Sequence, residues 1–108
     1  MPTYNKLVRD KIPNVIEATG KSFRTRNLDE EEYIKELKLK LAEEVGEYQA
    51  TLDDGQAIEE LADVMEIVHA LARVHGSTIE EVDKVREEKA NKRGGFQERI
   101  FLIDVEDE

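Results

Sequence analysis

The sequence predicts an all-α protein, a single-domain helical bundle over residues 1–108 with one short strand near the C-terminus. Apolar residues recur at steps of three and four between residues 29 and 52, and again between residues 56 and 75. This spacing is typical of helices that bury one face. A length of 108 residues suits one domain with a modest core. The absence of cysteine excludes disulfides and thiolate metal sites, and it suits a reducing compartment.

The first elements are expected to be a short helix and an extended segment. Residues 10–19 predict the helix, with Asp10 as its candidate N-cap, Pro13 in the first turn and Gly20 at the end. In residues 21–27, KSFRTRN, polar and basic residues alternate around Phe23, and this pattern predicts an extended segment.

Two long helices follow and form the centre of the predicted bundle. Asn27 or Asp29 is expected to cap the first, which runs to about residue 52, and the second covers residues 56–75. The second helix is aliphatic around most of its surface. Such a helix is central in a bundle or packs against a second subunit, so we expect a homo-oligomer.

The C-terminal part predicts one weaker helix and one strand. Gly76 ends the preceding helix, and Ser77 with Glu80 forms a candidate capping box for the last helix, which ends at the KRGGF motif. Residues 98–105, ERIFLIDV, are rich in β-forming residues and predict a strand whose natural partner is residues 21–27.

Charge and hydropathy narrow the possible partners and location. A net charge of −10 argues against nucleic-acid binding. The opening MPTYNKLVRDKIP lacks the apolar stretch of a signal peptide, and no apolar run approaches the length of a membrane helix. We therefore expect a soluble cytoplasmic protein without a membrane partner.

The acidic residues are concentrated in one block. Residues 43–66 hold nine acids and no lysine or arginine, whereas residues 1–26 and 84–99 are basic. If the two long helices lie antiparallel, Glu44 and Asp63 are equally far from their connection, and so are Glu47 and Glu60. The two acids on each helix are three residues apart and so are neighbours on its surface.

These four carboxylates predict a metal site. Partly buried carboxylates repel one another unless a cation holds them, and all-oxygen ligation favours Mg²⁺ or Mn²⁺. The alternative is a solvated acidic face, which is the common role of acidic runs on helices. Glu43, Glu59 and Glu66 are expected to be solvated. Lys40 is expected to be an exposed lysine near Glu36 and Glu44 rather than a phosphate ligand.

The motif E-x-x-E at Glu44 and Glu47, twelve residues, then E-x-x-D at Glu60 and Asp63 resembles the MazG-type all-α nucleoside triphosphate pyrophosphohydrolase superfamily. The surrounding KLAEEVGEYQ and IEELADVMEIVHAL are similar to its metal-binding helices. YNKLVRDKIP and KRGGF resemble a branch of small house-cleaning pyrophosphatases, often labelled phosphoribosyl-ATP pyrophosphohydrolase-like.

The resemblance implies a Mg²⁺-binding helical bundle, usually a dimer or tetramer. It would cleave a nucleoside triphosphate between the α and β phosphates, giving a monophosphate and pyrophosphate. The same four acids would be its catalytic metal ligands.

Phosphoanhydride cleavage also needs cations for the phosphates and a positioned water. The expected donors are Lys89, Lys92 and Arg93 near the end of the last helix, assisted by Arg9 or Lys6. One carboxylate of the cluster is expected to orient or deprotonate the water. Two alternatives stay open. One is a phosphoribosyl-ATP pyrophosphohydrolase, and the other is a non-catalytic helical oligomer that serves as an interaction module.

Overall fold

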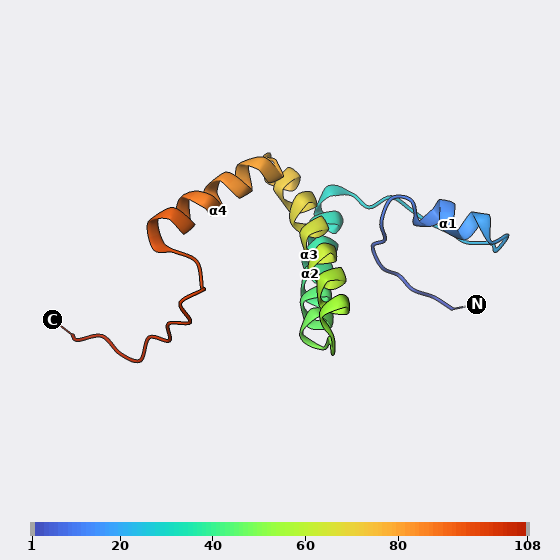
Figure 1. Ribbon diagram of the computed structural model, residues 1–108. Helices are drawn as coiled ribbons and strands as arrows, with labels where there is room; N and C mark the ends of the chain where they lie inside the picture. Colours follow the sequence, from blue (N-terminus) through green and yellow to red (C-terminus); the bar gives the residue numbers. More distant parts are fainter. Residues whose placement is uncertain (1, 108) are drawn as a thin grey trace.

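The computed structural model describes residues 2–107 and confirms an all-α chain. Within these residues there are four helices and no strand. The helices are α1 (Ile12–Ala18), α2 (Glu30–Gln49), α3 (Asp54–Val74) and α4 (Ile79–Arg93) (Figure 1).

The antiparallel pair of α2 and α3 is the centre of the molecule. The Asp29 side chain caps α2, and the Asp53 side chain caps α3 by accepting a hydrogen bond of 2.8 Å from the Gln56 backbone N–H. Each cap satisfies an N–H that has no partner inside its helix. Because Asp53 is the cap, α3 begins two residues before the predicted start, and Leu52 lies outside both helices.

Among the described residues, the buried apolar side chains lie on this pair alone. Leu37 of α2 and Ile67 and Ala72 of α3 are the buried hydrophobic residues among those described. Their positions agree with the apolar periodicity that predicts the two helices.

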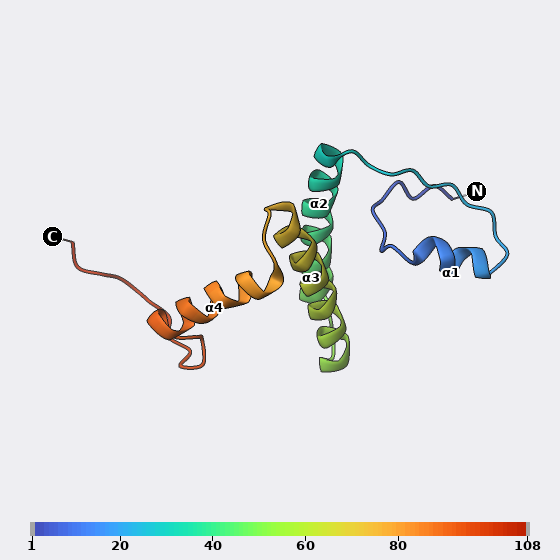
Figure 2. The same ribbon diagram turned by 90° about the horizontal axis from the view of Figure 1, so that it is seen from above.

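The start of α4 differs in detail from the prediction. Gly76 ends the α3 segment with a φ of 71°, as expected for a glycine after a helix. However, Thr78 and not Ser77 is the N-cap, and its hydroxyl accepts a hydrogen bond of 3.2 Å from the Glu81 N–H. The turn between Gly76 and α4 is therefore one residue longer than predicted, so the helix begins one residue later. From this cap α4 leads away from the hairpin and contacts only α3 among the helices (Figure 2).

The first helix is shorter than predicted and stands alone. Its N-cap is Lys11, which makes no side-chain capping bond, so the assignment of Asp10 as the cap is wrong. The physical reason is a backbone turn, closed by the Ile12 N–H donating to the Arg9 carbonyl, which delays the helix. Gly20 follows with a φ of 79°, as expected at the end. None of the other three helices contacts α1.

The single chain is extended and does not close a four-helix bundle. Its Cα radius of gyration is 18.7 Å, whereas a compact chain of this length has about 13 Å. Its accessible surface is 10147 Å², against about 6,100 Å² for a compact monomer of this mass. The segment with α1 and the segment with α4 leave the hairpin on opposite sides (Figure 1).

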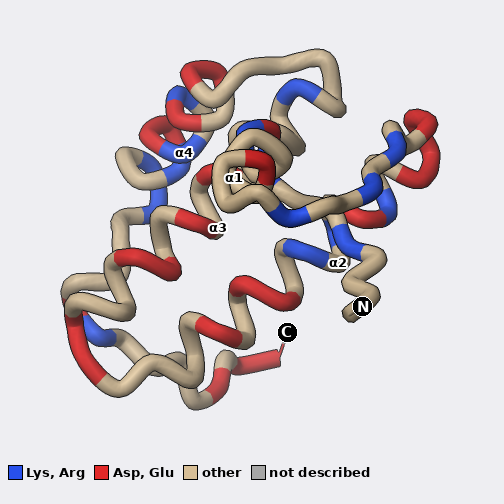
Figure 3. Tube along the Cα trace, turned by 90° about the vertical axis from the view of Figure 1, so that its right-hand side faces the viewer, with Lys and Arg blue, Asp and Glu red and all other residues tan. Residues whose placement is uncertain are grey.

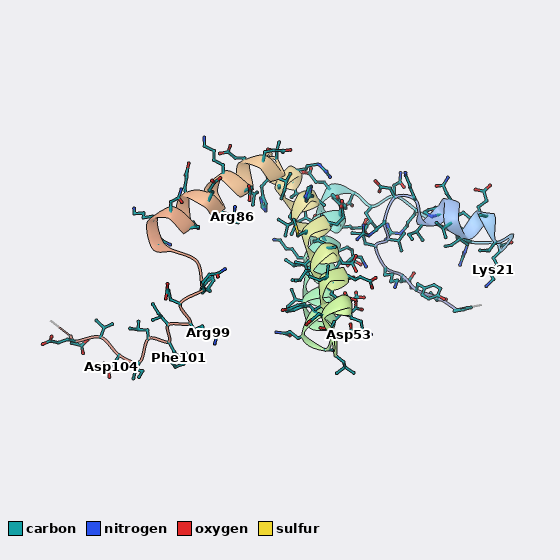
Figure 4. All side chains as sticks on the ribbon, viewed as in Figure 1. Lys21, Asp53, Arg86, Arg99, Phe101 and Asp104 are labelled. Atoms are coloured by element: carbon teal, nitrogen blue, oxygen red, sulfur yellow. The ribbon has the colours of Figure 1, made fainter. Side chains whose placement is uncertain are left out.

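The predicted C-terminal strand is absent from the structure. Residues 98–105 have no regular secondary structure, and neither do residues 21–27, the expected partner. Lys21 and Phe101, one from each segment, lie at opposite ends of the molecule (Figure 4). A strand needs a neighbour for its backbone groups, and within one chain neither segment has one.

None of the helices within residues 2–107 combines the length and apolar character needed to cross a bilayer.

Candidate metal centre

Three carboxylates converge between α2 and α3. One oxygen each from Glu44, Glu60 and Asp63 lies within 4.8 Å of the others. Acidic positions recur along both helices (Figure 3), and the antiparallel pairing brings residues equally far from the connection to the same height. The structure thereby brings together three of the four acids predicted as ligands.

The cluster contains charged oxygens that have no hydrogen-bond partner. Glu44 is only 8% exposed, and its Oε2 accepts no hydrogen bond. Glu60 Oε2 is likewise buried and without a partner. A buried carboxylate oxygen without a donor or cation is destabilising, so such atoms are exceptions that need an explanation.

The pKa of Glu44 shows the same unfavourable environment. Burial, the main cause, and the neighbouring carboxylates of Glu60 and Glu47 together raise this pKa from 4.5 to about 7. Near neutral pH the cluster therefore holds a proton that a divalent cation would displace.

Glu47 lies beside the three-carboxylate cluster rather than within it. It forms a second group with Glu43 and Glu44, again with one oxygen each within 4.8 Å. The four predicted ligands therefore do not form one set: Glu47 is exposed and groups with Glu43 and Glu44, not with Glu60 and Asp63. Glu43 is exposed, as expected for a solvated acid, and the structure adds that it lies within reach of Glu44 and Glu47. Its position four residues before Glu47 places the two acids on the same surface of the helix.

Cations from outside the acidic block approach the cluster. Arg9 Nη2 donates to Asp63 Oδ1 at 2.6 Å. Lys40 Nζ lies 3.9 Å from Glu44 Oε1, one helical turn away, and its side chain is only 21% exposed. The prediction that Lys40 lies near Glu44 is confirmed, but Lys40 is half-buried and not exposed as expected. Residues 43–66 contain no basic residue, but in the folded chain Arg9 and Lys40 lie beside acids of the cluster.

Lys6 shares a small cavity with residues of α2. This cavity has a volume of about 40 Å³, and Lys40 and Glu43 are among the α2 residues that line it. The Lys6 Nζ also lies 5.9 Å from the centre of the Tyr4 ring. Of the two phosphate ligands predicted in the N-terminal segment, Arg9 therefore lies against Asp63 of the cluster, and Lys6 shares a cavity with Glu43 of the second acidic group.

The three cations predicted on the last helix are not brought to the carboxylates within one chain. Lys89, Lys92 and Arg93 are exposed near the C-terminal end of α4. Within residues 2–107 they form no ion pair with the cluster. The reason is that α4 contacts α3 alone and points away from the hairpin.

The donor set fits a hard divalent cation. The converging atoms are carboxylate oxygens, and histidine and cysteine are absent from the cluster. Such all-oxygen sites suit Mg²⁺ and Mn²⁺ better than zinc. Together with the unpartnered oxygens of Glu44 and Glu60, this chemistry means that the residues fit the predicted metal.

A larger cavity lies at the other end of the hairpin. It has a volume of about 310 Å³ and is lined by residues of α2 and α3 and by Leu28. Glu30, Tyr33 and Arg73 are its polar side chains, and none of the clustered acids lines it. This cavity is therefore separate from the carboxylate cluster.

Comparison with known proteins gives one informative relative. An uncharacterized protein of Mycolicibacterium smegmatis is 43% identical to this chain over 54 residues, which are 50% of this chain and 55% of the relative. The chain thus spans about half the length of the curated relative it matches. No family model matches the chain. No solved structure matches it either.

Proposed function

We propose that this protein is a Mg²⁺-dependent nucleoside triphosphate pyrophosphohydrolase that cleaves between the α and β phosphates. The observation that carries the proposal is the cluster of Glu44, Glu60 and Asp63, in which two buried carboxylate oxygens lack any partner. The resemblance of the acidic motif and its flanking segments to the MazG-type superfamily supports the same reaction.

The clustered acids would hold the metal, with Glu44 shared between both acidic groups. When bound, Mg²⁺ would neutralise phosphate charge and orient the phosphoanhydride. Glu47 is exposed and lies outside the three-carboxylate cluster. It is therefore the carboxylate best placed to orient an attacking water by accepting a hydrogen bond.

Three cations are positioned to bind phosphate oxygens. Arg9 has five N–H donors, so it can keep its contact with Asp63 and still donate to a phosphate. Lys40 and Lys6 face the shared small cavity beside Glu43. Positive charge next to the metal ligands is what a triphosphate requires.

We also propose that the active protein is a homo-oligomer, a dimer or tetramer. The chain exposes about 4,000 Å² more surface than a compact monomer of its mass. Apolar side chains stay exposed on both helices and in their connection, namely Val45 and Tyr48 on α2, Leu52 in the connection, and Ile58, Leu61 and Met65 on α3. A second subunit covering them would bury this surface, and its α4 would be free to bring Lys89, Lys92 and Arg93 to the site.

The test is pyrophosphate release from a panel of canonical and damaged nucleoside triphosphates and phosphoribosyl-ATP, with and without Mg²⁺. We expect Mg²⁺-dependent release that falls at least about 100-fold in Glu60→Gln, because a ligand matters at least as much as its supporting residues. The matched control is Glu66→Gln, an exposed acid on the same helix.

The outcomes separate the alternatives. Release only from phosphoribosyl-ATP would assign the protein to that substrate instead. No release from any compound, with Mg²⁺ present, would favour the non-catalytic interaction module. Full activity in Glu60→Gln would exclude the proposed site.

A further inference from the structure

Residues 100–105 carry an apolar run, interrupted once by Asp104, that has no partner among the described residues. In the C-terminal segment, defined as residues 100–107, five large hydrophobic side chains are between 72% and 88% exposed. Within residues 2–107 no backbone hydrogen bond involves this segment, since the last one joins the Arg99 N–H to the Phe96 carbonyl. Such an exposed apolar run marks an interaction site. Its end is acidic, with Asp104, Glu106 and Asp107.

A second extended segment has the complementary character. Residues 21–27, the basic segment, carry Lys21, Arg24 and Arg26 and an exposed Phe23. Arg26 pairs with Glu32 at 2.9 Å, whereas Lys21 and Arg24 form no ion pair in the part of the chain described. Among residues 2–107, this segment's backbone makes one hydrogen bond, the long one in which the Lys21 N–H donates to the Thr19 hydroxyl at 3.4 Å.

The two segments cannot meet within one chain in this arrangement. Lys21 lies at one end of the molecule and Phe101 and Asp104 at the other, with the hairpin of α2 and α3 between them (Figure 4). The chain measures 64 Å along its longest axis. Two such chains that lie side by side and run in opposite directions would place each basic segment beside the other chain's C-terminal segment.

We propose that the basic segment of one copy pairs as an antiparallel strand with the C-terminal segment of a second copy, reciprocally, in a symmetric dimer. In the best register Arg24 lies opposite Asp104, and Lys21 lies opposite Asp107. The same register places Phe23 opposite Val105.

This register joins the side-chain pairs that favour strands. Opposite charges and aromatic with β-branched residues are the stabilising cross-strand pairs. The exchange also supplies hydrogen bonds to two backbones that now have almost none, and it uses one self-complementary surface twice, as a two-fold dimer requires. The occupant is a second copy of this chain because the acidic and basic partners are both its own residues.

Disulfide trapping tests the pairing directly, because the natural chain has no cysteine. Thr25 and Ile103 lie opposite each other in the proposed register. Thr25→Cys and Ile103→Cys chains with different tags are co-expressed, oxidised and separated without reductant. We expect a covalent dimer that contains one chain of each kind, while co-expression of Lys35→Cys with Ile103→Cys gives none, since Lys35 is exposed on α2. Linkage no greater than this control would overturn the proposal, as would a Thr25→Cys/Ile103→Cys double variant that links only within one chain.

Charge reversal provides a second measurement that needs no new covalent bond. Arg24→Glu and Asp104→Arg, each tested alone, should weaken dimerisation and raise its dissociation constant about tenfold, because each substitution acts twice in the dimer. The double variant should return to within about twofold of the natural chain by analytical ultracentrifugation. The control Lys35→Glu carries the same charge change and should leave the constant unaltered. Unchanged dimerisation in Arg24→Glu, or a double variant as weak as the two single changes combined, would overturn the pairing. Neither measurement depends on pyrophosphate release.

Discussion

Replacing Glu44 with glutamine removes one negative charge from the cluster while keeping nearly the same shape. Glu44 is 8% exposed, and burial with its acidic neighbours raises its pKa to about 7. A group whose pKa is raised by folding stabilises the native state fully below its unfolded pKa, here 4.5. That contribution is lost as the pH rises through about 7. At pH 8 and without metal, the ionised Glu44 is therefore destabilising.

The size of the effect follows from the shift. An increase from 4.5 to about 7, at about 1.4 kcal/mol for each pKa unit, gives an upper bound of about 3.5 kcal/mol. Lys40, at 3.9 Å, and the unpartnered amide of the new glutamine both reduce the gain. We expect metal-free Glu44→Gln to be more stable than the natural protein at pH 8 by about 1–3 kcal/mol, with little difference at pH 4.5.

The assay is urea unfolding at both pH values, with EDTA and with Mg²⁺. At 100 times its dissociation constant, Mg²⁺ stabilises a protein by about 2.7 kcal/mol, and this increment should disappear in Glu44→Gln. Glu66→Gln, which changes an exposed acid, is the control and should change neither quantity. A Glu44→Gln protein that is less stable than the natural one at pH 8 in EDTA, or that keeps the full Mg²⁺ increment, would refute the reasoning.

Three further predictions address the cap, the apolar surface and the pH dependence of metal binding. Asp53→Ala removes the bond to the Gln56 N–H and should lower the free energy of unfolding by about 1 kcal/mol in urea melts, with Asp54→Ala as the control. No loss would show that water replaces the cap. Leu61→Glu places a charge on the exposed apolar surface of α3 and should dissociate the oligomer in light scattering. An unchanged mass would place the interface elsewhere. Mg²⁺ affinity, measured calorimetrically, should rise from pH 5.5 to pH 8, because the pKa of Glu44 is raised to about 7 and the ion must displace its proton. A flat profile would contradict that role.

The local structure followed from the sequence because its causes are local. Apolar steps of three and four place α2 and α3 within a few residues of their observed ends. Errors arose where neighbouring residues compete for one role, as when Thr78 rather than Ser77 caps α4. The two side chains are chemically similar, and the backbone angles of the turn decide between them.

The carboxylate cluster was partly predictable for a geometric reason. Counting equal distances from a helix connection predicts that Glu44 and Asp63 share a height, and the structure places both in one group with Glu60. Counting residues from the connection gives the height of a side chain but not the direction in which it points around the helix axis. Glu47, which shares a height with Glu60, lies outside the group for this reason.

Long-range placement was the part that the sequence could not provide. Arg9 reaches Asp63 across 54 residues of sequence, and no local pattern encodes that contact. The expected strand of residues 98–105 has the right composition, but composition does not supply a partner within the same chain.

The most direct test of the central claim is the binding of Mn²⁺ to metal-free protein, with free Mn²⁺ followed by electron paramagnetic resonance. We predict saturable binding that Mg²⁺ displaces and that is weakened at least about tenfold in Glu60→Gln. Equal Mn²⁺ binding by the natural protein and by Glu60→Gln would contradict the claim that the acids between α2 and α3 hold a divalent ion.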